Sequence, residues 1–240
     1  MAILAFDTCL RSVSAAVNLD GRITSRFEAC ETGHAERLMP LIEAVLADAG
    51  IAFGDVTRIA VTLGPGGFTG LRVGISAARG FALALGVPVV GLTSLHVAAL
   101  GAAQQLATLG HTDRFVVAAP AGRDGVFAQV FGGDHAAVEA PPRLIWPDES
   151  VSDLAGAAVL GPGAALLEGR APGLIAVAAF AGLQPNAADL ARVAPDLTPL
   201  ADVRPLYLRA ADAKPQTATS QTTKGQTAKV LARAADSRQS

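Results

Sequence analysis

The sequence predicts an α/β fold with two sheets, each flanked by helices. Short apolar runs of strand length alternate with longer stretches of helical period, and turns rich in glycine and proline separate them. Gly161-Pro162-Gly163 repeats Gly64-Pro65-Gly66, and each triplet follows an apolar run. This echo suggests two related halves.

The composition allows a sizeable buried core, in one large domain or two small ones. The chain has 240 residues, of which 51% are hydrophobic and 17% are charged. Charged residues or Gly/Pro breaks interrupt every apolar stretch, and the first residues carry no basic leader, so we expect neither a membrane span nor a signal peptide. Two cysteines, Cys9 and Cys30, are too few for a disulfide framework, and they indicate a reducing cytoplasm.

Charge is unevenly distributed along the chain. Residues 213–240 hold five cations and one acid, a net charge of +4, so the preceding part carries −6. An acidic body is a poor binder of phosphate backbones. The end of the chain, residues 211–240, is rich in Thr, Ser, Gln and Ala. We expect it to be a disordered, solvated extension, with weak contact to RNA as the alternative.

The chain opens with a strand and a hairpin. Residues 2–6 form an apolar run that ends at Asp7. The runs 13–19 and 23–27 flank Asp20-Gly21, which is a strong signal for a two-residue hairpin turn.

A first helix follows. Apolar residues recur at helical spacing from Leu38 to Ala49, and Gly50 is placed to end the helix. Pro40 lies within this pattern. Because proline lacks an N–H, it either kinks the first turns or marks a later helix start.

A glycine-rich turn, residues 64–70, joins a strand at 59–63 to a helix at 71–85. A strand, a glycine turn and a helix start can form an anion site, because the N–H groups of the first turn have no partners inside the helix. The segment lacks the lysine of a Walker P-loop, since Leu71 follows Gly70. The alternative is a tight turn into a helix with Thr69 as its N-cap.

The helix at 71–85 is apolar nearly all round. Only Arg72, Ser76 and Arg79 are polar, and they fall roughly on one line. Such a helix is expected to be buried nearly all round, either inside this chain or between its own sheet and a partner protein.

The remaining elements alternate in the same way. We expect strands at 87–92, 114–119, 126–131, 135–145 and 157–160, helices at 95–109, 148–154 and 187–193, and a final extended segment at 204–208.

The residues show no catalytic or metal-binding spacing. The four histidines stand apart, and neither Cys-x-x-Cys nor Gly-x-Ser-x-Gly occurs. Asp7, an acid at the end of the first strand, is the best single candidate for a catalytic residue. The alternative is an ordinary aspartate that begins a turn.

Several segments carry a resemblance to a known family. Residues 3–8 with 14–17 resemble the first hairpin of the actin/sugar-kinase/Hsp70 (ASKHA) fold. Segments 34–46, 64–74 and 86–95, with Pro205–Arg209 at the end, are similar to the TsaB family, a bacterial family that takes part in threonylcarbamoyladenosine synthesis on tRNA. The similarity covers about residues 1–130 and 200–210.

The resemblance implies an ASKHA-like fold with two sheet-plus-helix subdomains. Residues 1–105 would form the first subdomain and carry the dimerisation helices. Residues 106–210 would form a smaller second one, and 211–240 the basic tail.

It also implies a subunit without catalytic residues or metal ligands. The sister protein TsaD holds a metal through His-x-x-x-His, where this chain has Ser94 and Ala98. No cofactor is expected on this chain, and ATP or ADP would belong to the complex. A second departure lies within TsaB itself, because Pro120–Phe127 replaces the family's usual Asp-Ala-Arg-x-x-Glu-Val-Tyr.

The implied function is that of a scaffold or activator. The subunit would dimerise with TsaD, a TsaE-like P-loop ATPase would join them, and tRNA would be bound only through the complex. In this family the first two long helices of each partner form a four-helix bundle. The residues expected at or near this interface are Leu38, Leu41, Ile42, Val45, Gly74, Ala77, Ala78 and Phe81. Self-association of the isolated chain through the same helices is left open.

The alternative function is a nucleotide-binding phosphotransferase or ATPase of the same fold. Asp7 would then hold Mg²⁺ through water. The residues expected to contact the nucleotide or its phosphates are Asp7, Thr8, Gly66, Gly67, Thr69 and Gly70. A peptidase, an older label for this superfamily, is not supported, because no metal pair or nucleophile–base arrangement is visible.

Overall fold

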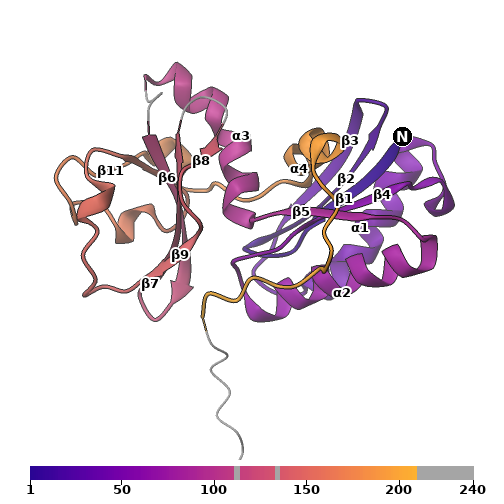
Figure 1. Cartoon of the computed structure of the whole chain (residues 1–240), viewed down its shortest axis with the longest axis horizontal. Helices are drawn as coiled ribbons and strands as arrows, with labels where there is room; N and C mark the ends of the chain where they lie inside the picture. The colour runs from indigo at the N-terminus through magenta and orange to yellow at the C-terminus, as the bar shows by residue number, and fades with distance from the viewer. Residues whose placement is uncertain (111–113, 133–135, 210–240) are drawn as a thin grey trace, which may run out of the picture. The chain divides into compact units, whose positions relative to one another are not determined.

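The computed structural model describes residues 1–110, 114–132 and 136–209 (Figure 1). The chain divides into a unit of residues 1–210 and a unit of residues 211–240. The second unit lies outside the described residues, so the expected disorder of the tail stays a prediction. Within the described ranges, no helix is both long enough and apolar enough to cross a membrane.

The first sheet has five strands in the order β3-β2-β1-β4-β5. An antiparallel meander comes first: β1 (Ala2–Asp7), β2 (Ser12–Leu19) and β3 (Arg22–Ala29). Two strands parallel to β1 follow it: β4 (Arg58–Thr62) and β5 (Val89–Leu92). Asp20 and Gly21 both take positive φ, as a two-residue hairpin turn requires, so this prediction is confirmed.

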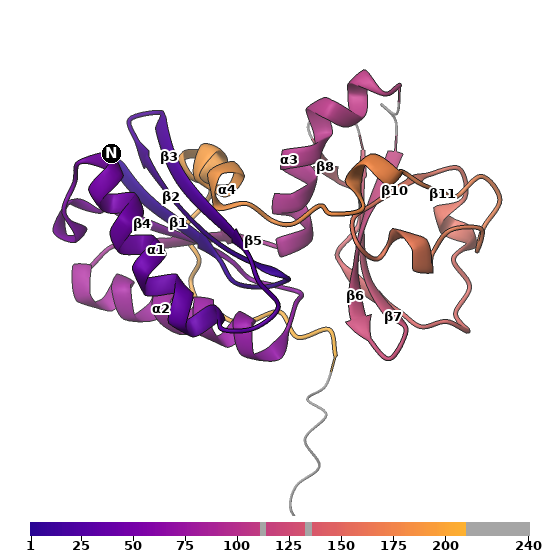
Figure 2. The ribbon, with the colours of Figure 1, turned by 180° about the vertical axis from the view of Figure 1, so that it is seen from behind.

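Helices cover both faces of the first sheet (Figures 1 and 2). The helices α1 (His34–Ala49) and α2 (Phe68–Leu85) lie on one face, and α4 (Ala187–Val193) lies on the other. Alternate residues of β1 therefore enter different cores. Leu4 packs with α1 and α2, whereas Ile3 packs with α4. Burial on both sides explains why the first strand is a continuous apolar run.

The second sheet has the order β11-β10-β6-β7-β8, and β9 also pairs with β7. Its antiparallel part is built from β6 (Arg114–Gly122), β7 (Gly125–Gly132), β8 (Ala137–Val138) and β9 (Arg143–Ile145). Its parallel part is built from β10 (Ala158–Leu160) and β11 (Ile175–Ala176). Because a parallel pair again follows an antiparallel meander, the second sheet repeats the topology of the first.

The two Gly-Pro-Gly turns occupy equivalent places in this repeat. Gly64 follows β4, which is parallel to β1, and Gly161 follows β10, which is parallel to β6. Their φ angles are 98° and 94°. Each turn then brings its second glycine against the backbone of the neighbouring segment, Gly66 at Cys9 just after β1 and Gly163 at Ala118 and Ala119 within β6. The repeated Gly-Pro-Gly motif in the sequence therefore corresponds to two related halves of the structure.

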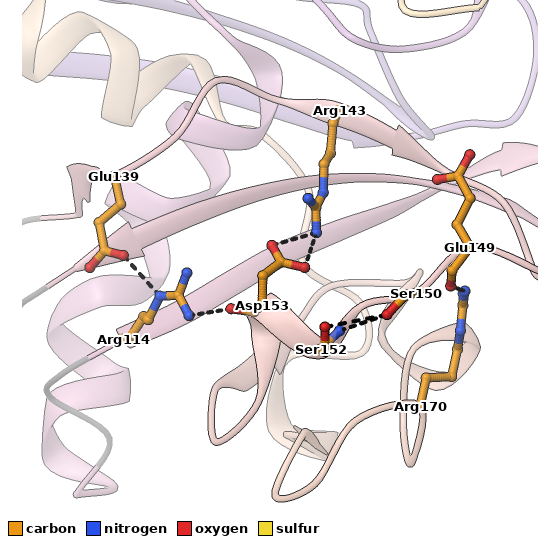
Figure 3. A network of polar contacts seen from close by, with 8 residues as sticks. All are labelled: Arg114, Glu139, Arg143, Glu149, Ser150, Ser152, Asp153 and Arg170. Carbon is orange, nitrogen blue, oxygen red and sulfur yellow. Dashed lines mark hydrogen bonds and ion pairs between the residues drawn. The ribbon is translucent and has the colours of Figure 1, made fainter.

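The second sheet is covered differently on its two faces. The helix α3 (Ser94–Thr108) packs on one face. Loops with short 3₁₀ turns cover the other face, and arginines tie them together (Figure 3). Arg143 donates to both carboxylate oxygens of Asp153, and Arg114 donates to the Asp153 carbonyl and to Glu139. Arg170 donates to the carbonyls of Trp146 and Glu149.

Some predicted elements differ from the structure. The helix α1 begins at His34 and runs through Pro40, so a helix start after this proline is wrong. Instead of one strand at 135–145 there are the short strands β8 and β9, because Pro141 and Pro142 remove two backbone donors between them. The helix expected at 148–154 is only a 3₁₀ turn, Ser152–Leu154.

The last described segment returns to the first sheet. The helix α4 packs on β1 and β2, and Asn18 donates to the carbonyl of Ala191. Residues 197–209, which we call the strap, then run in extended form along the first sheet and α2 without joining a strand ladder. The expected division into subdomains 1–105 and 106–210 stays a prediction.

Candidate functional site

The glycine-rich turn packs against the turn that follows β1. Gly66, Gly70 and Gly74 are spaced four residues apart and face Thr8 and Cys9. A Cβ atom on Gly66 would collide with the Cys9 carbonyl oxygen, and one on Gly70 with the Thr8 carbonyl oxygen. A Cβ on Gly74 would lie 2.6 Å from Thr8 Oγ1. The three glycines are therefore needed for the close approach of this chain's own backbone.

Hydrogen bonds close the same contact. The Gly67 N–H donates to the Cys9 carbonyl at 2.8 Å, and Thr8 Oγ1 donates to the Gly70 carbonyl at 2.7 Å. Two of the groups that we expected to contact phosphate are thus engaged within the chain. The N-cap is Gly67 and not Thr69, which lies in the first turn of α2 with an exposed side chain, so that prediction is wrong.

Asp7 lies behind this contact with no exposed surface. Its Oδ1 accepts hydrogen bonds from Thr62 Oγ1 at 2.5 Å and from the Cys9 N–H at 3.2 Å. Its Oδ2 has no partner among the described residues. Burial raises the pKa of Asp7 to about 7, because the charged form is poorly solvated there, and these hydrogen bonds only partly oppose the shift.

A cavity of about 600 Å³ opens beside the closed turn. The amino-terminal ends of α1 and α2 line it, together with the turn after β1, the end of β6 and two loop residues, Pro162 and Gln184. Asp7 does not reach it. Its lining includes the charged residues Arg11, Glu31 and Glu36, as well as His34, whose Nε2 lies 2.8 Å from the Leu10 carbonyl oxygen. The volume suits a small ligand. Of the six expected nucleotide contacts, Gly67, Thr69 and Gly70 line this cavity, whereas Asp7, Thr8 and Gly66 do not.

Ser94 and Ala98, at the positions of the sister protein's metal ligands, are structural. Ser94 Oγ donates to the Pro65 carbonyl at 2.5 Å, and Ala98 is buried against the second sheet. The His96 ring packs at a tilt against Phe131 with ring centroids 5.4 Å apart, and burial lowers the pKa of His96. Within residues 1–110, 114–132 and 136–209, no three His, Cys, Asp or Glu side chains are grouped so that they could hold a metal. His111 and His135 lie outside the described residues.

Most of the residues expected at a helix interface are buried in this chain's own core. Leu38, Leu41, Ile42, Val45 and Ala78 are buried between the helices and the sheet. Gly74, at the Thr8 contact, is also buried. Ala77 and Phe81 are partly buried against the same core. The apolar stripes that the sequence shows on both helices therefore face the chain's own sheet, and the expected role of these residues at or near a partner interface stays a prediction.

The polar line of α2 faces the strap. Arg79 Nε donates to the Val203 carbonyl at 2.7 Å, and Arg72 Nε donates to the Tyr207 hydroxyl at 2.9 Å. The Arg72 guanidinium also lies 3.7 Å from the ring centre of Phe68. The polar line of α2 thus binds a distant segment of the chain, a role that the sequence did not predict.

The last turns of α2 present an exposed apolar surface. Leu83 is 87% exposed, and Gly80 and Ala84 beside it on the helix are also exposed. We call these three residues the α2 docking surface. Met39 of α1 is 44% exposed. Of the two alternatives for α2, burial entirely inside this chain is therefore wrong, and burial between its own sheet and a partner stays a prediction.

Comparison with known proteins agrees with this architecture. Residues 28–140 match the family model described as TsaD: tRNA N6-adenosine threonylcarbamoyltransferase. The Escherichia coli protein named tRNA threonylcarbamoyladenosine biosynthesis protein TsaB is 38% identical over 102 residues, which is 42% of this chain and 44% of that protein. The protein of the same name from Buchnera aphidicola is 37% identical over 97 residues, 40% of this chain and 46% of that protein. The matched region thus spans less than half the length of these curated relatives.

Solved structures extend the similarity over most of the described chain. An uncharacterised Pseudomonas aeruginosa protein with similarity to peptidase YeaZ superposes with a TM-score of 0.74 at 28% identity, covering 87% of this chain and 99% of that one. YeaZ from Pseudomonas aeruginosa superposes with a TM-score of 0.70 at 29% identity, covering 82% and 92%.

The repeated sheet topology and the paired Gly-Pro-Gly turns define a protein of the ASKHA class. Its sequence and structural relatives specify the group within that class. In sequence and in structure, the chain is similar to proteins named TsaB or YeaZ.

A first prediction concerns the glycine contact. Gly70→Ala should destabilise the protein by about 1–3 kcal/mol, because the new methyl group meets the Thr8 carbonyl oxygen. Gly80→Ala is the matched control in the same helix. Nothing lies within 4 Å of its added Cβ, so the change should be neutral or stabilising by up to about 1 kcal/mol. Urea unfolding measures both, and equal effects would contradict the assignment.

A second prediction concerns Asp7. Its pKa is raised from 3.8 to about 7 on folding, so the folded state binds more protons than the unfolded state in that range. Its stabilising contribution is complete below about pH 4 and is lost as the pH rises towards and through 7, by roughly 4 kcal/mol in total. Asp7→Asn should remove this dependence and be more stable than the wild type at pH 8. Parallel stability profiles of the two proteins between pH 5 and 8 would refute the assignment.

Proposed function

We propose that this chain is a non-catalytic subunit of the system that makes threonylcarbamoyladenosine on tRNA. It would act in the cytoplasm as a scaffold or activator by docking onto a TsaD-like catalytic subunit. The names of its curated relatives and its match to the TsaD family model support this role. A TsaE-like ATPase would join the pair, tRNA would be bound through the complex, and ATP or ADP would act at that level.

The observation that carries the proposal is the exposed apolar end of α2. A leucine that is 87% exposed, next to Gly80 and Ala84, lets a partner helix approach the backbone closely and bury Leu83. The neighbouring polar line of the helix is already bound to the strap, so the α2 docking surface is what this helix offers to another protein.

The contacts of the glycine-rich turn, residues 64–70, argue against phosphate chemistry as the function of this chain. A carboxylate that holds Mg²⁺ through water needs access to solvent, and Asp7 has none. The Gly67 N–H and the Thr8 hydroxyl, which a phosphate would use, bond to the chain itself. The phosphotransferase or ATPase alternative therefore has less support than the docking function. Appreciable ATP hydrolysis by the isolated chain would favour it.

We propose a docking surface that differs from the interface residues expected from the sequence. Ala78 has no exposed surface and packs in the core, so Ala78→Arg would disturb the isolated fold and could not report on association. The exposed residue of the same helix that tests docking is Leu83.

Leu83→Arg should weaken binding to the TsaD-like protein of the same organism by roughly 30-fold or more, because it places a charge where an apolar anchor would be buried. The thermal stability of the isolated chain should not change. Leu166→Arg, at a leucine that is 40% exposed on the second half, is the matched control and should bind normally. Calorimetric titration of the purified pair measures both. Normal binding by folded Leu83→Arg would contradict the proposed surface.

A further inference from the structure

The strap binds the first half of the structure almost to its end. The Leu206 N–H donates to the Leu63 carbonyl at 2.7 Å. The Tyr207 ring packs at a tilt on Phe68 with ring centroids 5.3 Å apart, and the Tyr207 hydroxyl accepts a hydrogen bond from Arg72. Tyr207 is thus held at the first turns of α2.

The last two residues of the strap contact the second half instead. Leu208 packs against the core that α3 shares with the second sheet. The Arg209 guanidinium donates to the Ala121 carbonyl, near the end of β6. In both views the yellow end of the strap lies between α2 and the hairpin of β6 and β7 (Figures 1 and 2). The strap therefore crosses from one half to the other between Tyr207 and Leu208.

These contacts lie at the rim of the 600 Å³ cavity. Phe68 belongs to the wall that the first half contributes. Pro120 and Gly122, which precede and follow the residue whose carbonyl accepts from Arg209, belong to the wall that the second half contributes. The end of the strap therefore joins the two walls, and the width of the cavity depends on whether these contacts are made.

The two halves can move without disrupting either core. Among the described residues, the core beneath α1 and α2 and the core beneath α3 share only Leu10, a partly buried residue at the margin of both. A fixed joint lies at the start of α3, where the Ser94 N–H donates to the Gly64 carbonyl at 2.8 Å and Val97 packs with α4. Separate cores on a fixed joint are the arrangement of a hinge.

We propose that residues 207–209 are a clasp across the cavity. While its contacts are made, the clasp holds the two halves closed. When they open, the second half swings about the start of α3 and the cavity widens. Tyr207 is 43% exposed, and single polar contacts at a surface contribute little to stability, so the clasp opens without unfolding of either half.

The clasp goes beyond the docking function and does not depend on it. It uses the first turns of α2, through Phe68 and Arg72, whereas the α2 docking surface lies at the last turns of the helix. The clasp controls access to the cavity from within the chain, and the isolated protein is sufficient to test it.

Distance measurements between spin labels on the two halves test the clasp. Glu43→Cys on α1 and Glu168→Cys in the second half place labels at exposed positions of the full chain in a Cys30→Ser background, where the remaining Cys9 is buried. Double electron–electron resonance should give one narrow distance distribution. Adding Tyr207→Ala with Arg209→Ala should broaden this distribution and shift it to longer distances.

Arg79→Gln is the matched control. Arg79 binds the same strap at the Val203 carbonyl, but entirely within the first half, so its loss should leave the distribution narrow. Thermal unfolding checks that each variant is folded, and the milder pair Tyr207→Phe with Arg209→Gln carries the same test if the alanine pair is not. The proposal fails if a folded clasp variant keeps the native distribution, or if Arg79→Gln broadens it equally.

Discussion

The close approach of Thr8 and Cys9 to α2 is the contact on which the rest of the first half depends. It needs three glycines at a spacing of four, and it fixes the start of α2 against the end of β1. Asp7 is sealed behind it, and its carboxyl group becomes a buried hydrogen-bond acceptor for Thr62 and the Cys9 N–H. A motif that could cradle phosphate thus serves here to join two segments of one chain.

This contact also determines which side of α2 is buried in the core and which side is exposed. Because Gly74 and Ala78 face β1 and β4, the opposite side of the helix turns outward. Its polar line binds the strap through Arg72 and Arg79, which leaves Leu83 near its end uncovered. The helix α2 therefore contacts the sheet and the strap, and it leaves an apolar surface exposed at its end.

Short sequence patterns predicted those turns and helix ends that depend only on neighbouring residues. The hairpin at Asp20-Gly21, the helix end at Gly50 and the Gly-Pro-Gly echo are all confirmed, since each follows from backbone preferences within a few residues. Helical periodicity does not distinguish an apolar stripe that faces the chain's own sheet from one that faces a partner. Leu38 and Ala78, which we expect at or near the interface, are buried in the core. The need for glycine at position 70 could not be predicted either, because the Thr8 backbone that it contacts is far away in the sequence.

We propose that the exposed end of α2 meets the TsaD-like partner. Hydrogen–deuterium exchange of the chain, alone and with the TsaD-like protein, tests it directly. Because local opening controls exchange, binding should slow exchange of the backbone amides at residues 80–85 and leave the already closed residues 64–70 unchanged. Protection confined to residues 64–70, or no protection along α2 in a complex shown to have formed, would contradict it.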